Sequence, residues 1–216
     1  MGLWSSLFGK KVTIQGQDEN GKSFERELAR HGFIVGQIVY RGVSGGTWRN
    51  SGKTIQSALP SALADNGDIY ILYGGANDVL EASPPGILNP DVLDAIKNVV
   101  SSIITTVNPE AIIIVTQTPI QGDSTNGRNN PAHNAYGVPM LNTYFKNIPA
   151  YAENVSTGWQ EKIFIADVYT ALGNPMPDNY TKGGLDPTLD DIHPSAFQAS
   201  RVGQIIGETI RNNVLK

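Results

Sequence analysis

Two residues near the end of the chain have the types and spacing of a hydrolytic base and its partner. Asp190 and His193 lie three residues apart in "DDIHPS", directly before a predicted C-terminal helix. An imidazole can take a proton from a nucleophile, and a carboxylate on its other ring nitrogen fixes the tautomer that this requires. Asp190 or Asp191 could equally cap the following helix, and that use is compatible with the chemical one.

A carboxylate, Asp18, stands where many hydrolases display a nucleophilic serine. The stretch "VTIQGQDENGKSF" is predicted to form a short strand, a turn at Asp18 and the start of a helix. Ser23 belongs to that helix as its N-cap and is not expected to be a relocated nucleophile. An aspartate can itself act as a covalent nucleophile, so Asp18 remains a candidate catalytic residue.

The elements that must position these residues alternate along the chain. Short apolar runs predict strands, and stretches with a period near 3.6 predict helices. The predicted strands cover 12–15, 33–42, 68–75, 110–119 and 162–169, and the predicted helices 23–32, 52–65, 90–108, 141–154 and 195–216. This alternation predicts an α/β fold: a single-domain three-layer α/β/α sandwich with a flavodoxin-like, mostly parallel five-stranded sheet. Loops beyond the carboxyl ends of such strands hold the working residues.

Composition narrows the classes of protein. The chain has 216 residues, 40% of them hydrophobic, which predicts one core: a short segment 1–11 and one domain 12–216. A net charge of -4 and the lack of a long Lys/Arg run argue against nucleic-acid binding. With no cysteine and three scattered histidines, we expect no metal site, and without a Gly-rich phosphate loop after the first strand we expect no cofactor.

The N-terminal stretch "MGLWSSLFGKK" is not expected to be a signal peptide, because its basic residues follow its brief apolar part. No run approaches the ~20 apolar residues of a membrane span. The compartment stays open; a cytoplasmic or virion-associated protein, and a component of a larger assembly, are both compatible with this sequence.

Four short blocks at the predicted strand ends form a recognisable series: "GQD", "GVSGGTW", "GGAND" and "DDIHPS". In this order they resemble the SGNH hydrolases, also called the GDSL esterase and lipase family, over essentially the whole chain. The most specific parts are Gly75–Asp78 and Asp190–Pro194. The Gly-Gln pair before Asp18 also resembles the Gly-Gln-Ser-Asn variant of carbohydrate acetylesterases.

The resemblance implies a role for each residue. His193 would be the base and Asp190 its partner, while Asp18 occupies the position of the serine. The Gly45 backbone N–H and the Asn77 side-chain amide would donate to the oxyanion, together with the N–H of the residue at the nucleophile position. A purely local use remains open for the two donors, since Gly45 could serve only a tight turn and Asn77 could only cap a helix.

Asp18 leaves three explanations open. It could attack an ester to form a mixed anhydride that water, activated by His193, then cleaves. It could abolish catalysis and leave a binding or structural protein, or it could replace a native serine by engineering. Its negative charge beside His193 would favour the imidazolium, which opposes general-base function.

A rival nucleophile lies in "GVSGG", which matches the G-x-S-x-G elbow of another hydrolase fold at Ser44. This alternative explains neither "GGAND" nor the residues before His193. The polar loops 121–139 and 173–190 favour small-molecule or glycan esters, with short acyl or acetyl groups, over lipid esters. His31, at a helix end, and His133, in the first polar loop, are expected to be structural or solvated, with a small chance that His133 touches substrate.

Overall fold

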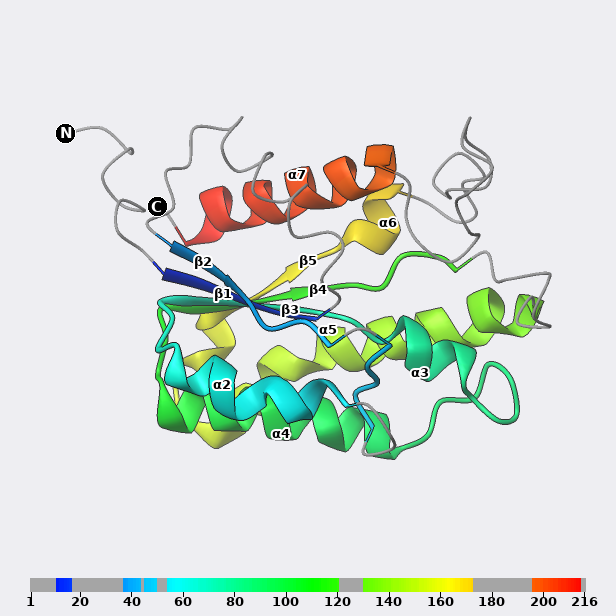
Figure 1. Ribbon diagram of the computed structural model, residues 1–216, viewed down its shortest axis with the longest axis horizontal. Helices are drawn as coiled ribbons and strands as arrows, with labels where there is room; N and C mark the ends of the chain where they lie inside the picture. The colour runs from blue at the N-terminus through cyan, green and yellow to red at the C-terminus, as the bar shows by residue number, and fades with distance from the viewer. Residues whose placement is uncertain are drawn as a thin grey trace.

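A parallel five-stranded sheet forms the centre of the protein (Figure 1). The computed structural model describes residues 11–16, 37–43, 45–49, 54–120, 130–172 and 196–214. Every neighbouring pair of strands is parallel, and their order is β2-β1-β3-β4-β5. The strands are β1 (Lys11–Gly16), β2 (Gln37–Tyr40), β3 (Ile69–Tyr73), β4 (Ala111–Val115) and β5 (Ile163–Ala166). The predicted five-stranded α/β fold is confirmed.

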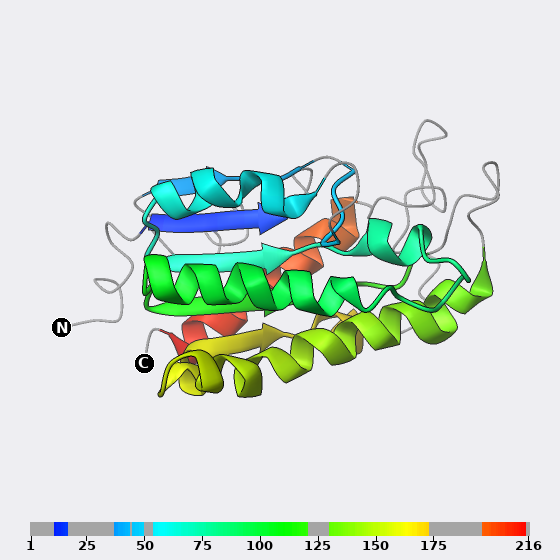
Figure 2. The ribbon, with the colours of Figure 1, turned by 90° about the horizontal axis from the view of Figure 1, so that it is seen from below.

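Helices cover both faces of the sheet, as Figures 1 and 2 show. One face carries α2 (Leu59–Ala64), α4 (Asp91–Thr106) and α5 (Val138–Val155), and the other α6 (Val168–Leu172) and α7 (Ala196–Asn213). The short α3 (Ala76–Leu80) follows β3 directly. The described residues also include three irregular turns: the 3₁₀ turns η3 (Ile55–Ala58) and η5 (Trp159–Lys162), and the π-helical turn η4 (His133–Gly137).

The central strands are buried on both sides, which explains their unbroken apolar sequences. In β3, Tyr70 and Leu72 join the core beneath α4 and α5, whereas Ile69 and Ile71 join the core beneath α7. β4 divides its side chains between the two layers in the same way. Side chains alternate between the faces of a strand, so only a strand covered twice needs apolar residues at every position.

Helix α4 shows the sequence pattern most plainly. Its buried residues recur every three or four positions and face the sheet: Val92, Ala95, Ile96, Val99, Val100, Ile103 and Ile104. Pro90 is the N-cap, where a missing N–H costs nothing, and Asp91 and Asp94 lie in the first turn near the positive end of the helix dipole. The chain leaves the helix through Asn108, whose positive φ of 54° ends it.

Several predicted boundaries differ from the structure. β2 ends at Tyr40, two residues before the predicted end at 42, and the described part of the predicted helix 52–65 consists of η3 followed by α2. The chain already turns helical at Pro131, so the predicted loop 121–139 is too long. The predicted helix 23–32 lies outside the described residues, and the division into 1–11 and 12–216 stays a prediction.

His133 is not in a loop, as the sequence suggested, but in the π-helical turn η4. Its side chain is buried, at 4% exposure, which agrees with a structural role and excludes a solvated one. His31 lies outside the described residues. Within the described part of the chain, no helix is both long enough and apolar enough to cross a bilayer.

Candidate active site

The order of the strands brings three loops together at the carboxyl-terminal end of the sheet. β1 lies between β2 and β3, and all three run in the same direction. Ile14 pairs with Tyr40 on one side of β1, and Gly16 pairs with Tyr73 on the other. Loops that follow neighbouring parallel strands leave the sheet together, so the segments after Gly16, Tyr40 and Tyr73 begin side by side.

The loop after β2 turns sharply at its two glycines. The N–H of Gly46 donates to the carbonyl oxygen of Val43 at 2.9 Å, which closes the turn. Gly45 is exposed and has a φ of +70°, a conformation that favours glycine. A Cβ on Gly46 would lie 2.8 Å from the oxygen of Val43, so no larger residue fits without movement. The turn therefore requires the Gly-Gly pair.

The loop after β3 also depends on two glycines. Gly75 is the N-cap of α3 with φ +114°, and a Cβ there would lie 2.5 Å from Cδ2 of Leu141. A Cβ on Gly74 would lie 2.8 Å from Cδ1 of Ile55. The chain can thus pass from β3 into α3 tightly against the core, which brings Asn77 directly beside the end of the strand.

Asn77 and the Gly45 turn are in direct contact. The half-buried Asn77 side chain donates from Nδ2 to the carbonyl oxygen of Gly46 at 3.2 Å. A primary amide has two N–H groups, so this bond orients Asn77 and leaves a second donor. The structure thus brings Asn77 into contact with the turn that holds Gly45, across 31 residues of the chain. The N-cap of α3 is Gly75, so Asn77 lies inside the helix and does not have the capping role that the sequence left open for it.

Asp78 is a site residue to which sequence reasoning assigned no role of its own. Only 2% of it is exposed, and its carboxylate accepts the backbone N–H of Trp48 at 2.8 Å and that of Arg49 at 3.2 Å. Burial raises the pKa of Asp78 to about 6, although the two N–H groups and the Arg49 charge act in the opposite direction. Its position next to Asn77 in "GGAND" is the sequence feature from which a role for Asp78 in the site could have been predicted.

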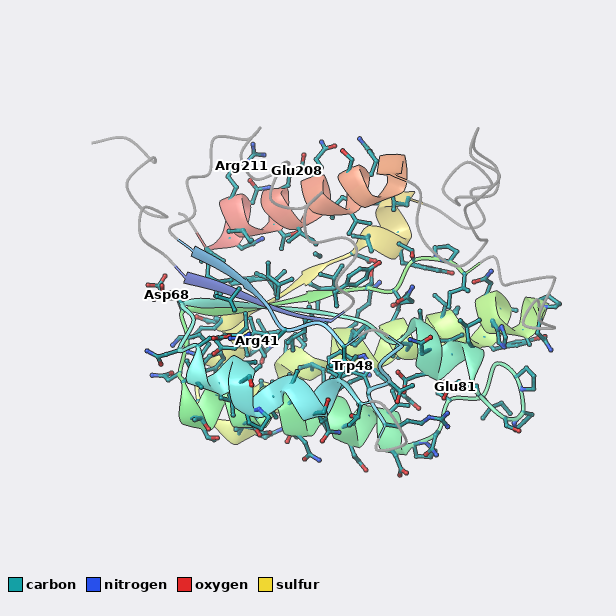
Figure 3. The ribbon with its side chains drawn as sticks, in the orientation of Figure 1. Arg41, Trp48, Asp68, Glu81, Glu208 and Arg211 are labelled. Carbon is teal, nitrogen blue, oxygen red and sulfur yellow. The ribbon has the colours of Figure 1, made fainter. Side chains whose placement is uncertain are left out.

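Trp48 anchors the same loop in the core. Its side chain is fully buried and meets the ring of Phe145 edge to face, with centroids 6.2 Å apart. Nε2 of Gln56 donates to the carbonyl oxygen of Trp48 at 3.1 Å. Figure 3 shows Trp48 on the side of the sheet that α2 and α3 cover. The loop that carries Gly45 is therefore held by packing as well as by hydrogen bonds.

Two asparagines hold the chain after β4. The buried side chain of Asn142 accepts the N–H of Gln117 at 2.7 Å and donates to its carbonyl oxygen at 3.0 Å. Asn134 bonds to both backbone groups of Ile120 in the same way. Each asparagine side chain thus provides one donor and one acceptor to the backbone of a residue beyond the end of β4, as a neighbouring strand would. Sequence patterns could not predict these pairs, because each joins residues distant along the chain.

A cavity of about 260 Å³ lies beside Arg49, in the loop after β2. It is lined by Arg49, Ala82, Ser83, Ile87, Leu88, Asn89 and Pro90. The Arg49 guanidinium forms an ion pair with Glu81 at 2.5 Å, and Ile87 is 56% exposed. The cavity combines a cation and polar groups with an apolar wall, a lining suited to a small polar molecule that has an apolar face.

Three predicted residues, Asp18, Asp190 and His193, lie outside the described residues, as does Ser44 of the rival elbow. Their described chain neighbours are nevertheless informative. Gly16 ends β1 at the edge where Asn77 lies, and α7 begins at Ala196 at the same end of the molecule, as Figures 1 and 2 show. Among the described residues, no group of three His, Cys, Asp or Glu side chains could hold a metal ion.

The parallel sheet and the helices on its two faces define an open three-layer α/β/α fold. No protein-family model and no curated protein sequence matches the chain. Solved structures do match over nearly its whole length. The carbohydrate acetylesterase Est24 from Sinorhizobium meliloti superposes with a TM-score of 0.64 at 16% identity, covering 94% of this chain and 99% of its own.

Two further structures give the same result. A putative acylhydrolase from Bacteroides fragilis has a TM-score of 0.60 at 16% identity and covers 99% of this chain and 94% of its own. A GDSL-like lipase from Bacteroides thetaiotaomicron has a TM-score of 0.58 at 18% identity, with coverages of 95% and 87%. The chain thus has the fold of the SGNH hydrolases, as its four sequence blocks predicted.

Proposed function

We propose that the protein is an SGNH-type hydrolase of carboxylic esters that acts on short acyl or acetyl groups carried by carbohydrate. The observation that carries this proposal is the contact between Asn77 and the Gly45–Gly46 turn, at the edge where β1 delivers the chain toward Asp18. An oxyanion requires two or more donors in one place, and the contact of Asn77 with the turn that holds Gly45 supports this use of the two residues.

The remaining roles are those that the resemblance implies. Asp18 is two residues beyond Gly16, which ends β1, and His193 is three residues before Ala196, which begins α7. His193 acts as the base, oriented by Asp190, and the Gly45 N–H and the Asn77 amide stabilise the tetrahedral oxyanion.

Asp18 sets the first step. Its carboxylate oxygen attacks the ester carbonyl, the C–O bond to the alcohol breaks, and a mixed anhydride forms while the alcohol takes a proton from the imidazolium. Water, losing its proton to His193, then cleaves the anhydride and restores the carboxylate. A serine at position 18 would instead give its own proton to His193 and form an ordinary acyl-enzyme.

The substrate class rests on the described cavity and on the neighbours. The cavity beside Arg49 has polar groups and one apolar wall, and its volume of about 260 Å³ suits a sugar-sized group better than a long acyl chain. One structure of the same fold is named as a carbohydrate acetylesterase and another as an acetyl xylan esterase. Both observations favour acetylated carbohydrate.

A binding protein of the same fold is the second candidate, and Asp18 itself favours it. A carboxylate next to an imidazole stabilises the protonated ring, which then cannot take a proton. Such a protein would keep the pocket and bind the glycan without turnover. Assembly with other proteins stays a prediction, and the mass of the purified protein in solution would test it.

The experiment compares the protein with its Asp18→Ser variant on 4-nitrophenyl acetate and on acetylated xylo-oligosaccharides. We expect the variant to gain activity, and the double change Asp18→Ser, His193→Ala to lose most of that gain. An acyl group trapped on Asp18 and found by mass spectrometry would establish the carboxylate nucleophile. If neither protein hydrolyses any ester in a broad panel, the hydrolase proposal fails and binding of the glycan becomes the function to measure.

A further inference from the structure

Two adjacent residues of α3 form hydrogen bonds with the backbone of three residues in the loop after β2. Asn77 donates to the carbonyl of Gly46, and Asp78 accepts from the N–H groups of Trp48 and Arg49. The two loops come from β2 and β3, which are not neighbours, because β1 lies between them. The contact therefore crosses over the end of β1, where the nucleophile loop begins.

The choice of an aspartate at this buried position has a physical cost. A carboxylate at 2% exposure loses most of its hydration, and this loss raises the pKa of Asp78. Two backbone N–H donors need an acceptor on each side, and a carboxylate has two oxygens without a competing hydrogen. An asparagine would turn an N–H toward one of the donors, so the pattern of bonds specifies aspartate.

We propose that Asp78 is a positioning residue of the oxyanion hole, which fixes the Gly45 N–H at the correct distance from the Asn77 amide. It acts through the backbone of Trp48 and Arg49 and touches no substrate itself. This inference rests on the proposed hydrolase function, because an oxyanion hole has a purpose only in that reaction. The tether itself, however, can be measured in a protein without activity.

The geometry explains why packing alone is insufficient. Trp48 is locked in the core by Phe145, but Gly45 lies three residues earlier in an exposed turn with no atom within 4 Å of its Cβ position. Between them, the Gly46 N–H bond to Val43 closes the turn internally without attaching it to α3. Only the bonds of Asn77 and Asp78, among the described residues, attach this loop to α3 through its backbone.

The first test measures amide hydrogen exchange in the protein as it stands. We expect Asp78→Asn to speed exchange at Trp48 and Arg49 by at least tenfold, with smaller changes in β4 and α4. The matched control is Asp65→Asn. Asp65 accepts two hydrogen bonds from the Arg41 side chain near the start of the same loop, at 2.8 and 2.6 Å, whereas Asp78 accepts from backbone N–H groups of that loop. The control should leave exchange at Trp48 and Arg49 unchanged.

The second test uses the active Asp18→Ser background. Loss of one oxyanion donor lowers kcat by about 100- to 1,000-fold in other hydrolases, so a donor that is merely misplaced should cost about 10- to 100-fold. We expect Asp78→Asn to lower kcat by that factor and to change KM by less than twofold, while Asp65→Asn lowers kcat by less than threefold. A variant with an intact site but lower stability would not show a lower kcat in the folded protein together with an unchanged KM.

The outcomes separate the two proposals. If neither the protein nor its Asp18→Ser variant hydrolyses an ester, the hydrolase proposal fails, and hydrogen exchange still decides whether Asp78 holds the loop. Unchanged exchange at Trp48 and Arg49 overturns the positioning role, and so does faster exchange with unchanged kcat in the active background. Should Asp78→Asn fail to fold, judged by circular dichroism, Asp78→Ser supplies the same measurements with a smaller acceptor.

Discussion

Gly16 pairs with Tyr73 across β1 and β3, and this pair sets the position of the chain that leads to Asp18. Asn77 follows Tyr73 by four residues, and Asp18 follows Gly16 by two. Both segments thus start from paired positions in one sheet. A shift of the register by a single residue would move the two loops apart by about 3.3 Å and turn the side chains of one strand to the opposite face.

The first prediction concerns Asn77. In the active Asp18→Ser background, Asn77→Ala should lower kcat by about 100-fold or more, because an amide donor to the oxyanion is lost. Steady-state kinetics on 4-nitrophenyl acetate measure this. Asn154→Ala, which removes an exposed side-chain bond to the backbone of α5, is the control and should leave kcat unchanged. A kcat within threefold of the background would contradict the assignment of Asn77.

The second prediction compares two glycines with positive φ. Gly45→Ala should lower the free energy of unfolding by about 1 kcal/mol, because the backbone is left-handed and the space is open. Gly75→Ala should cost more than about 3 kcal/mol, since a Cβ would also overlap Leu141. Urea denaturation of both variants provides the comparison. Equal losses would mean that α5 can move away from Gly75.

The third prediction tests the asparagine that holds the chain after β4. Asn142→Ala leaves the N–H and the carbonyl of Gln117 buried without this partner, which should cost about 2 to 4 kcal/mol of unfolding free energy. Asn154→Ala again serves as the exposed control and should cost less than about 0.5 kcal/mol. Chemical denaturation followed by Trp fluorescence distinguishes the two. A small loss for Asn142→Ala would indicate that another group replaces the amide.

The fourth prediction concerns pH. The folded-state pKa of Asp78 is about 6, above the ordinary value near 4, so the folded protein binds this proton more tightly than the unfolded chain does. The free energy of unfolding should therefore fall as pH rises from about 4 to about 6, by up to ~3 kcal/mol from this group. Denaturation curves between pH 4 and 7 should show this slope in the protein and its loss in Asp78→Asn. Parallel pH profiles would contradict it.

The fifth prediction concerns the cavity beside Arg49. If that cavity holds the carbohydrate part of the substrate, Arg49→Gln should raise KM for an acetylated oligosaccharide by about tenfold, the effect of one lost charge-assisted hydrogen bond. KM for 4-nitrophenyl acetate, which has no sugar, should change by less than twofold. Equal effects on the two substrates would place the carbohydrate elsewhere, and a preference for long-chain lipid esters would overturn the substrate class.

Much of this architecture is contained in local sequence. The runs 69–73 and 111–115 predict strands because every position is apolar, and both faces of these strands are indeed covered. The stripe of α4 and the turn at Gly45–Gly46 can be recognised in the same way, since each depends on neighbours a few residues away, whereas Gly74 and Gly75 are required by the distant Ile55 and Leu141. The four blocks at the strand ends were enough to predict the fold that the comparisons show.

What only the tertiary structure decided are the relations between distant residues. The order β2-β1-β3 depends on how the crossover helices pack, and it alone brings Asn77 to Gly46 over the end of β1. The bond from Trp48 to Asp78 joins residues 30 apart, and that from Gln117 to Asn142 joins residues 25 apart. Hydrogen bonds of this kind produce no periodic pattern in the sequence, because the two partners are distant along the chain and meet only in the folded structure.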